Sequence, residues 1–460
     1  MELKPYEIIK KIYYASVLAN TVFKAPRTAW WLLKASSAFM YEKETLFNRS
    51  NRFGFQKIGS SFWTPEELDA YRHDSLATSR VYGRLLKAAE NKTPVVWLDW
   101  PVPIEIVKGF DVAAYVPESF MIAANIVGTD GHVACLEAVE RAGIADDICA
   151  MDRITIGAWL TKQIPPPAAI IAVAHPCDAG RTTNQILEYM TGAPAFTINT
   201  SYTKNDEDVM LYSKNLFEAI EFLEDILKMK FNWQKFEEMV HILNKHNYYL
   251  NEITAMNQNI PSPGLAYSLQ AAWLSKIPCA GDPDIMENAR KIYEIAKKSI
   301  QNPEHRHRKE KFRIIVADMP IVFTELFKWI ENSFGGVVVS DYIGDAIYPE
   351  IDTSSRESMM MGVARDRLYA GMIKQAHGKA SETIDDLERQ ISQFSADCVI
   401  FNGHQGCRHN RALSRMVKDV CARHKIPSLM MEADIFDKRV MSEEKLKKEL
   451  TDFFRENGFA

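Results

Sequence analysis

The chain has 460 residues and a formal net charge of −5, with 47% hydrophobic and 25% charged residues. This length and composition are typical of a globular protein with several domains, and the acidic balance disfavours nucleic-acid binding as the main function. No apolar run reaches the roughly 18 residues of a membrane-spanning helix, and the N-terminus lacks a signal-peptide pattern. We therefore expect a cytoplasmic protein with no transmembrane segment.

Residues 1–92 are predicted to form a helical N-terminal region. Thr64, followed by Glu66 and Glu67, is a helix-capping signal for the helix that comes next. Aromatic residues gather ahead of it, around positions 30–41. A cluster of this kind usually marks an interface, so we expect it to contact another subunit or to cover a domain.

Two blocks of alternating pattern follow, and each predicts an α/β domain. In residues 93–213 and again in residues 310–460, short apolar runs alternate with helical segments, which is typical of a parallel sheet covered by helices. Between them, residues 214–309 return to helical spacing, which predicts a helical insert, and the basic segment 305–311 predicts a linker into the second block. The predicted fold is α/β, with two flavodoxin- or Rossmann-like parallel-sheet domains that are candidates for an internal duplication.

Chemically useful residues gather where the predicted strands end, which is where open α/β sheets bind ligands. The residues expected there are Asp99, Trp100, Glu118, Cys177 and Asp178 in the first block, and Asp318, Asp341, Cys407 and Asp434 in the second. Asp178 is expected to be the N-cap of the following helix. His404, Gln405 and His409 flank Cys407, but no second Cys or His pair at local spacing supports a zinc site there.

Three of the seven cysteines, Cys149, Cys177 and Cys407, stand at predicted helix starts. Free backbone N–H groups and the helix dipole stabilise a thiolate at such a position, and thiolate is the form that binds metal. The alternative for any single cysteine is a small buried hydrophobic residue. That alternative fits the remaining cysteines, of which one, Cys279, lies in a predicted loop. No C-x-x-C pair and no phosphate-binding loop occurs in the chain.

An ordered set of motifs between residues 95 and 460 resembles one family. The motifs are YVPES, AAN, DG, CLEAVERAGIADDIC, HPCD, GHQGC and IPSLMMEADIFDKR. Together they are similar to the motifs of the 2-hydroxyacyl-CoA dehydratases, which share a fold with the catalytic subunits of ATP-dependent benzoyl-CoA reductase. The resemblance implies a [4Fe–4S] cluster, with Cys149, Cys177 and Cys407 as its ligands.

The resemblance also implies a reaction and its partners. Three cysteine ligands leave one iron open to a water or a substrate oxygen. One low-potential electron converts the thioester of a 2-hydroxyacyl-CoA into a ketyl radical anion, which expels the 2-hydroxyl group and then loses an acidified β-proton before the electron returns. Glu118 matches the family's acidic residue near the substrate, and its alternative is a solvated strand-end carboxylate. The expected partners are a paralogous second subunit, the acyl-CoA substrate and a separate iron–sulfur ATPase that supplies the electron.

At one position the sequence departs from the family pattern. Dehydratase subunits that resemble this chain carry a serine that holds the ligand of the open iron, and here Trp100 takes that place beside Asp99. An indole cannot coordinate iron, so either Asp99 takes over or the subunit relays electrons and Trp100 shields the cluster. Three functions stay open: a subunit of a 2-hydroxyacyl-CoA dehydratase, a subunit of an aryl- or acyl-CoA reductase, and a non-catalytic iron–sulfur relay or assembly protein.

Overall fold

The computed structural model describes the two α/β blocks and most of the helical regions. The described residues are 7–24, 64–120, 131–265 except 202 and 204, 274–302, 309–319, and 326–460 except 343, 346, 438 and 441. The aromatic cluster around positions 30–41, the AAN motif and most of the basic segment 305–311 lie outside these residues.

The first block contains a parallel sheet of four strands. In spatial order these are β2 (Ala113–Tyr115), β1 (Val95–Leu98), β3 (Ala169–Val173) and β4 (Ala195–Ile198). The connections include α6 (Glu105–Lys108), α8 (Gly131–Arg141), α9 (Ala150–Leu160) and α10 (Asp178–Thr191). β1 and β3 are apolar and buried along their whole length, because helices cover both faces of the sheet.

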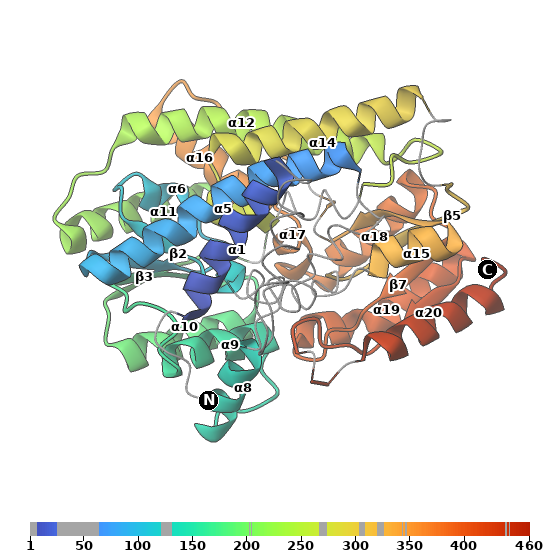
Figure 1. Ribbon diagram of the computed structural model, residues 1–460, viewed down its shortest axis with the longest axis horizontal. Helices are drawn as coiled ribbons and strands as arrows, with labels where there is room; N and C mark the ends of the chain where they lie inside the picture. The colour runs from blue at the N-terminus through green and yellow to red at the C-terminus, as the bar shows by residue number, and fades with distance from the viewer. Residues whose placement is uncertain are drawn as a thin grey trace, which may run out of the picture.

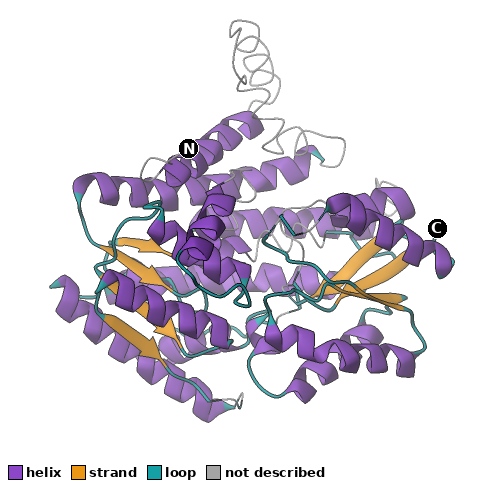
Figure 2. Ribbon diagram, turned by 90° about the horizontal axis from the view of Figure 1, so that it is seen from below, coloured by secondary structure: helices purple, strands orange, loops and turns teal. Residues whose placement is uncertain are grey.

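The second block repeats this topology (Figure 2). Its parallel strands, in spatial order, are β6 (Gly336–Asp341), β5 (Phe312–Val316), β7 (Cys398–Phe401) and β8 (Ser428–Met430). Its helices are α15 (Leu326–Phe334), α16 (Arg356–Leu368), α17 (Ile373–Ala376), α18 (Ala380–Gln393), α19 (Arg408–His424) and α20 (Glu443–Glu456). Numbered within each block, both sheets have the strand order 2-1-3-4. The prediction of two parallel-sheet units is confirmed, and the shared order fits an internal duplication.

Long helices accompany the two sheets. They are α1 (Glu7–Lys24), α5 (Pro65–Asn91), α11 (Asp206–Leu227), α12 (Trp233–Met256) and α14 (Pro283–Gln301). α14 packs against both α5 and α12, and the three run along one side of the molecule (Figure 1). The predicted capping box is present at the start of α5, where Thr64 and Glu67 exchange hydrogen bonds of 3.1 and 2.8 Å. None of the described helices combines the length and the apolar character that a membrane crossing requires.

One hydrophobic core extends through both blocks. It includes Val96 and Ile170 from the first sheet and Ile314 from the second. Ile315, the next residue of β5, belongs to a smaller core on the opposite face of the second sheet, because successive side chains of a strand point to opposite faces. The two sheets therefore pack around a shared core, and this holds the loops at their carboxyl ends in fixed relation to each other.

Candidate functional site

The candidate site lies where the strand order reverses in each sheet. In both blocks the second and third strands lie on opposite sides of the first, which opens a crevice beyond the carboxyl ends of the first and third strands. Asp99 follows β1, and Cys177 lies in the loop after β3. Asp318 and Cys407 lie in the corresponding loops after β5 and β7. The two cysteines therefore occupy equivalent corners of the two sheets.

Each of the three candidate cysteines is the N-cap of a helix. Cys149 precedes α9, Cys177 precedes α10, and Cys407 precedes α19. The sulfur of Cys177 accepts a hydrogen bond of 3.4 Å from the backbone N–H of Gly180. The prediction that Asp178 is the N-cap was wrong. The thiol takes the cap position, and Asp178 lies in the first turn of α10, where the helix dipole favours an anion.

The second block brings Cys407 to the two cysteines of the first block. Gly406 approaches Cys149 so closely that a Cβ atom on it would stand 2.5 Å from the Cys149 Cα, which leaves room only for glycine. The thiols also influence one another: Cys407 and Cys177 both raise the pKa of Cys149, and Cys407 raises the pKa of Cys177. Three cysteines that are far apart in the sequence therefore converge on one place.

Arg408 marks the same convergence at the surface. Its guanidinium forms ion pairs of 2.6 Å with Asp147, in the loop before α9, and of 3.2 Å with Asp178, in the first turn of α10. All three side chains are exposed, so the pairs contribute little to stability. They show, however, that the starts of α9, α10 and α19 are neighbours.

Burial raises the pKa of all three thiols. Desolvation lifts the pKa of Cys149 and Cys177 well above the usual value, and the nearby Asp152 carboxylate raises both further. For Cys407, burial raises the pKa to about 11. At Cys177 and Cys407 the N–H groups of the helix start lower the pKa, as expected from the sequence, but desolvation is the larger effect. A bound metal would supply positive charge that favours the thiolate form of these cysteines.

His404 joins Cys149 to the second block. Its Nε2 lies 3.2 Å from the Cys149 sulfur, and its Nδ1 faces the backbone N–H of Ile435 at 3.4 Å. Burial lowers the pKa of His404, so its ring is neutral at pH 7. The sequence suggests this residue only as a zinc ligand beside Cys407, whereas the structure places it against Cys149.

Three buried carboxyl groups lie on the first-block side of the site. Asp99, Glu118 and Asp152 are 4%, 8% and 5% exposed. Burial raises the pKa of each, and that of Asp152 to about 6. Asp99 lies within hydrogen-bonding distance of Glu118 and raises its pKa further. Asp99 also accepts a hydrogen bond of 2.6 Å from Asn184. Neighbouring carboxyl groups of this kind share protons and can donate or accept one near neutral pH.

The donor set defines what the site can hold. Among the described residues, no three His, Cys, Asp or Glu side chains stand close enough to bind one metal ion together. A [4Fe–4S] cluster makes a different demand, because each thiolate binds a different iron and the sulfurs surround the cluster. Three soft sulfur donors at three separate helix starts, brought together by the close packing of Gly406 on Cys149, fit that requirement.

The row of Cys149, His404 and Asp434 also has the order of a nucleophilic cysteine triad. Asp434 stands 3.7 Å from the Nδ1 of His404. Nucleophilic cysteines have a lowered pKa, but burial raises the pKa of Cys149 well above its usual value. The electrostatics of this row therefore do not favour a nucleophilic thiol.

The other cysteines are core residues. Cys398 lies in β7, while Cys135 and Cys421 lie in α8 and α19. The predicted loop at Cys279 was wrong, since residues 274–279 are helical in the described part of the chain and bury Ile277 as well. Burial raises the pKa of all four thiols, which behave as small hydrophobic side chains.

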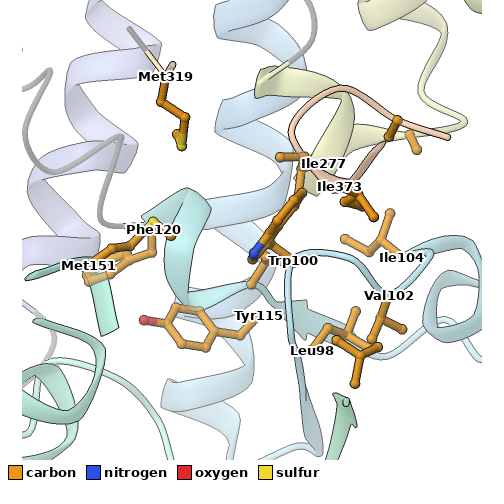
Figure 3. Packing of buried hydrophobic residues seen from close by; sticks show 14 of the residues in the cluster. Leu98, Trp100, Val102, Ile104, Tyr115, Phe120, Met151, Ile277, Met319 and Ile373 are labelled. Carbon is orange, nitrogen blue, oxygen red and sulfur yellow. The ribbon is translucent and has the colours of Figure 1, made fainter. Parts of the chain in front are cut away.

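Trp100 is part of the hydrophobic core. Its side chain is 7% exposed and belongs to the same cluster as Ile277 and Ile373, toward which the indole extends in Figure 3. Met151, in the first turn of α9, lies beside Phe120 on the other side of that view. The residue after Asp99 is therefore a buried apolar side chain of the core. That Trp100 shields a cluster stays a prediction.

Two residues of the site are not apparent from the sequence. Asp152 contacts Cys149 from the first turn of α9. It stands three residues after that cysteine, a spacing that brings the two side chains together at a helix start and that could have indicated this contact. Asn184 holds Asp99 across 85 residues of sequence. No local pattern marks such a partner, because the contact depends on how α10 packs against the loop after β1.

One family model and two known proteins are similar to large parts of this chain. The family model "2-hydroxyglutaryl-CoA dehydratase, D-component" matches residues 100–455, which include all three cysteines and His404. The alpha subunit of the (R)-2-hydroxyisocaproyl-CoA dehydratase of Clostridioides difficile is 26% identical over 251 residues, which cover 52% of this chain and 61% of that protein. A benzoyl-CoA reductase subunit of Thauera aromatica is 22% identical over 404 residues, which cover 81% of this chain and 91% of that protein.

Proposed function

Because this chain belongs to the family of the 2-hydroxyglutaryl-CoA dehydratase D-component, we propose that it is the iron–sulfur subunit of an enzyme that dehydrates a 2-hydroxyacyl-CoA to a 2-enoyl-CoA. One observation carries the proposal: Cys149, Cys177 and Cys407 converge at the starts of three helices. The relatives are named as subunits, so we propose a paralogous second subunit as partner, with a separate iron–sulfur ATPase as the electron donor.

Cys149, Cys177 and Cys407 would hold a [4Fe–4S] cluster. When bound, such a cluster supplies a low-potential electron and, with three cysteine ligands, one iron that can take an oxygen ligand. The chain itself contributes a partly buried environment, because the three cysteines are half-buried and desolvation raises the pKa of each thiol. It also contributes three helix starts, whose backbone N–H groups partly compensate the negative charge of thiolates.

Glu118 is the proposed base and Asp99 its proton partner. Removing a weakly acidic β-proton requires a base whose conjugate acid holds the proton firmly. Burial and the Asp99 carboxyl raise the pKa of Glu118 well above its usual value. One Glu118 oxygen is buried without a hydrogen-bond partner in the described part of the chain, so it is available to a substrate proton. Asp99, held by Asn184, would share that proton.

A subunit of an aryl- or acyl-CoA reductase is the second candidate. One observation supports it, namely how much of this chain each relative covers. The benzoyl-CoA reductase subunit aligns with 81% of this chain, against 52% for the dehydratase subunit. In a reductase, the electrons would remain in the reduced product, whereas in a dehydratase the electron would return to the enzyme. A non-catalytic relay or assembly role is the third candidate.

One experiment separates these candidates. The chain is coexpressed with its partner subunit under anaerobic conditions and analysed for iron and sulfide, and the complex with its activator is then assayed with 2-hydroxyacyl-CoA and with aryl-CoA thioesters. Water elimination with catalytic electron use supports the dehydratase, and stoichiometric electron consumption supports the reductase. A complex that holds the cluster but turns over neither substrate supports a relay role. A complex without iron contradicts the proposal.

A further inference from the structure

Two of the three cysteine sulfurs face backbone donors of the helices that they cap. The N–H of Gly180 donates to Cys177 at 3.4 Å. The N–H groups of His409 and Asn410 lie within electrostatic reach of Cys407 and partly offset the rise in its pKa. Both arrangements follow from the N-cap position, which presents free N–H groups of the first turn to the cap side chain.

Cys149 has a donor of another kind. Like Cys407, its side chain accepts no capping hydrogen bond from the helix that it precedes. The donor group next to its sulfur is instead the imidazole of His404, at 3.2 Å, which comes from the second block. Because this donor is a side chain, mutation can replace it. His404 is 255 residues from Cys149 in the sequence, so the contact forms only when the two blocks have folded together.

The ring of His404 has polar neighbours on the side away from Cys149. Nδ1 faces the backbone N–H of Ile435 at 3.4 Å, and the backbone of Ala433 is a further hydrogen-bond partner of the ring. The Asp434 carboxylate stands 3.7 Å from Nδ1, beyond hydrogen-bond distance, and accepts two backbone N–H groups at 2.9 Å. A thiolate sulfur that binds a cluster has no hydrogen to donate, so the hydrogen of this contact must come from Nε2, which lies 3.2 Å from the Cys149 sulfur. With His404 only 3% exposed, this contact is shielded from water.

We propose that His404 is a positioning residue that donates an N–H···S hydrogen bond to Cys149 and thereby raises the reduction potential of the cluster. A donor at a ligand sulfur stabilises the additional negative charge of the reduced cluster more than it stabilises the oxidised form. This role rests on the proposed function, because it requires a cluster at Cys149, Cys177 and Cys407.

Two substitutions at His404 test the role in the assembled, anaerobically purified complex. His404→Gln keeps an N–H donor near the position of Nε2, and His404→Met has a similar length without a donor. Iron and sulfide are quantified in each, and the midpoint potential is measured by a redox titration followed by EPR. We expect a more negative potential in His404→Met and a return toward the wild-type value in His404→Gln. Equal potentials in wild type and His404→Met overturn the proposal.

A second measurement covers the case in which His404→Met does not retain its cluster. Wild-type complex containing isotopically labelled histidine is reduced and examined by pulsed EPR. A weak coupling of the cluster to a labelled nitrogen, absent from His404→Gln, supports the hydrogen bond, and the lack of such a coupling in wild type overturns it. Wild-type complex without any iron overturns the proposed function together with this role. An intact cluster without the coupling overturns the role of His404 alone.

Discussion

The two sheets place a buried aspartate at the same corner and hold it in the same way. Asp99 follows the first strand of the first sheet and accepts a hydrogen bond from Asn184, on the helix that Cys177 caps. Asp318 follows the first strand of the second sheet and accepts one from Asn410, on the helix that Cys407 caps. In both blocks, an aspartate–asparagine bond thus fixes the cysteine-capped helix to the neighbouring strand.

The neighbours of the two aspartates are different. Asp99 lies beside two further acids, Glu118 and Asp152. Burial raises the pKa of all three, Asp152 adds to the rise at Asp99, and both aspartates add to the rise at Glu118. Asp318 instead accepts the backbone N–H groups of Met319 at 2.6 Å and His404 at 3.3 Å. Burial raises the pKa of Asp318 as well, but its backbone donors and Asn410 oppose that rise, whereas neighbouring acids add to the rise at Asp99 and Glu118. A group of buried acids can exchange protons, and a carboxyl group held by several N–H donors is a structural anchor. One corner is therefore suited to proton transfer and the other to holding Cys407 and His404 in place.

The largest effect is expected at the cysteines that join the two corners. Cys407→Ala should reduce the iron and sulfide content of the complex to background and abolish turnover, because the second block then contributes no ligand. Cys279→Ala is the matched control, since Cys279 is fully buried in the core, and it should leave the iron content unchanged. A Cys407→Ala complex with full iron content would show that the cluster lies elsewhere.

The next effect separates the two corners by their chemistry. Glu118→Gln keeps the size of the side chain and removes the carboxylate, so kcat should fall by about 10²–10⁴-fold, the usual contribution of an acid or base, with the cluster retained. Asp318→Asn should instead cost about 1–3 kcal/mol of folding stability, because an amide group now faces backbone donors. Turnover per bound cluster should change little in that variant. Loss of turnover in both variants, with normal stability, would contradict the division of roles.

The strands could be predicted from the sequence because buried parallel strands are continuous apolar runs. Residues 169–173 and 312–316 are almost entirely apolar and are buried throughout. The sequence also indicates Cys177 and Cys407 at helix starts, since each follows such a run and precedes a helical pattern. These features depend on residues within one segment, and local physics is sufficient to recognise them.

Features that depend on tertiary packing could not be predicted in the same way. His404 meets Cys149 across 255 residues of sequence, and no local spacing reports that contact. Capping preferences rank Asp above Cys, yet the corner of the sheet starts α10 so that Cys177 takes the cap and Asp178 does not. The thiol pKa values were also missed, because desolvation is a property of the folded surroundings.

A third effect concerns folding stability alone, at the contact between the two blocks. Arg367 on α16 forms a buried ion pair of 3.2 Å with Glu105 on α6, whose side chain is fully buried. Arg367→Met leaves that carboxylate without its cation, so the free energy of unfolding should fall by about 3–5 kcal/mol in urea. Arg408→Ala removes an exposed interblock pair and should leave the urea midpoint almost unchanged. Equal losses in the two variants would mean that burial does not decide the strength of this contact.

The smallest effect is expected at Trp100, and it concerns the environment of the site rather than its ligands. The buried indole lowers the local dielectric and excludes water, so Trp100→Ser should shift the cluster potential and accelerate oxygen damage, with little change in substrate affinity. Redox titration, the rate of cluster loss in air and substrate binding are measured on the same assembled complex. A selective loss of substrate affinity at an unchanged potential would instead assign substrate contact to this position, and with it place the open iron next to Asp99.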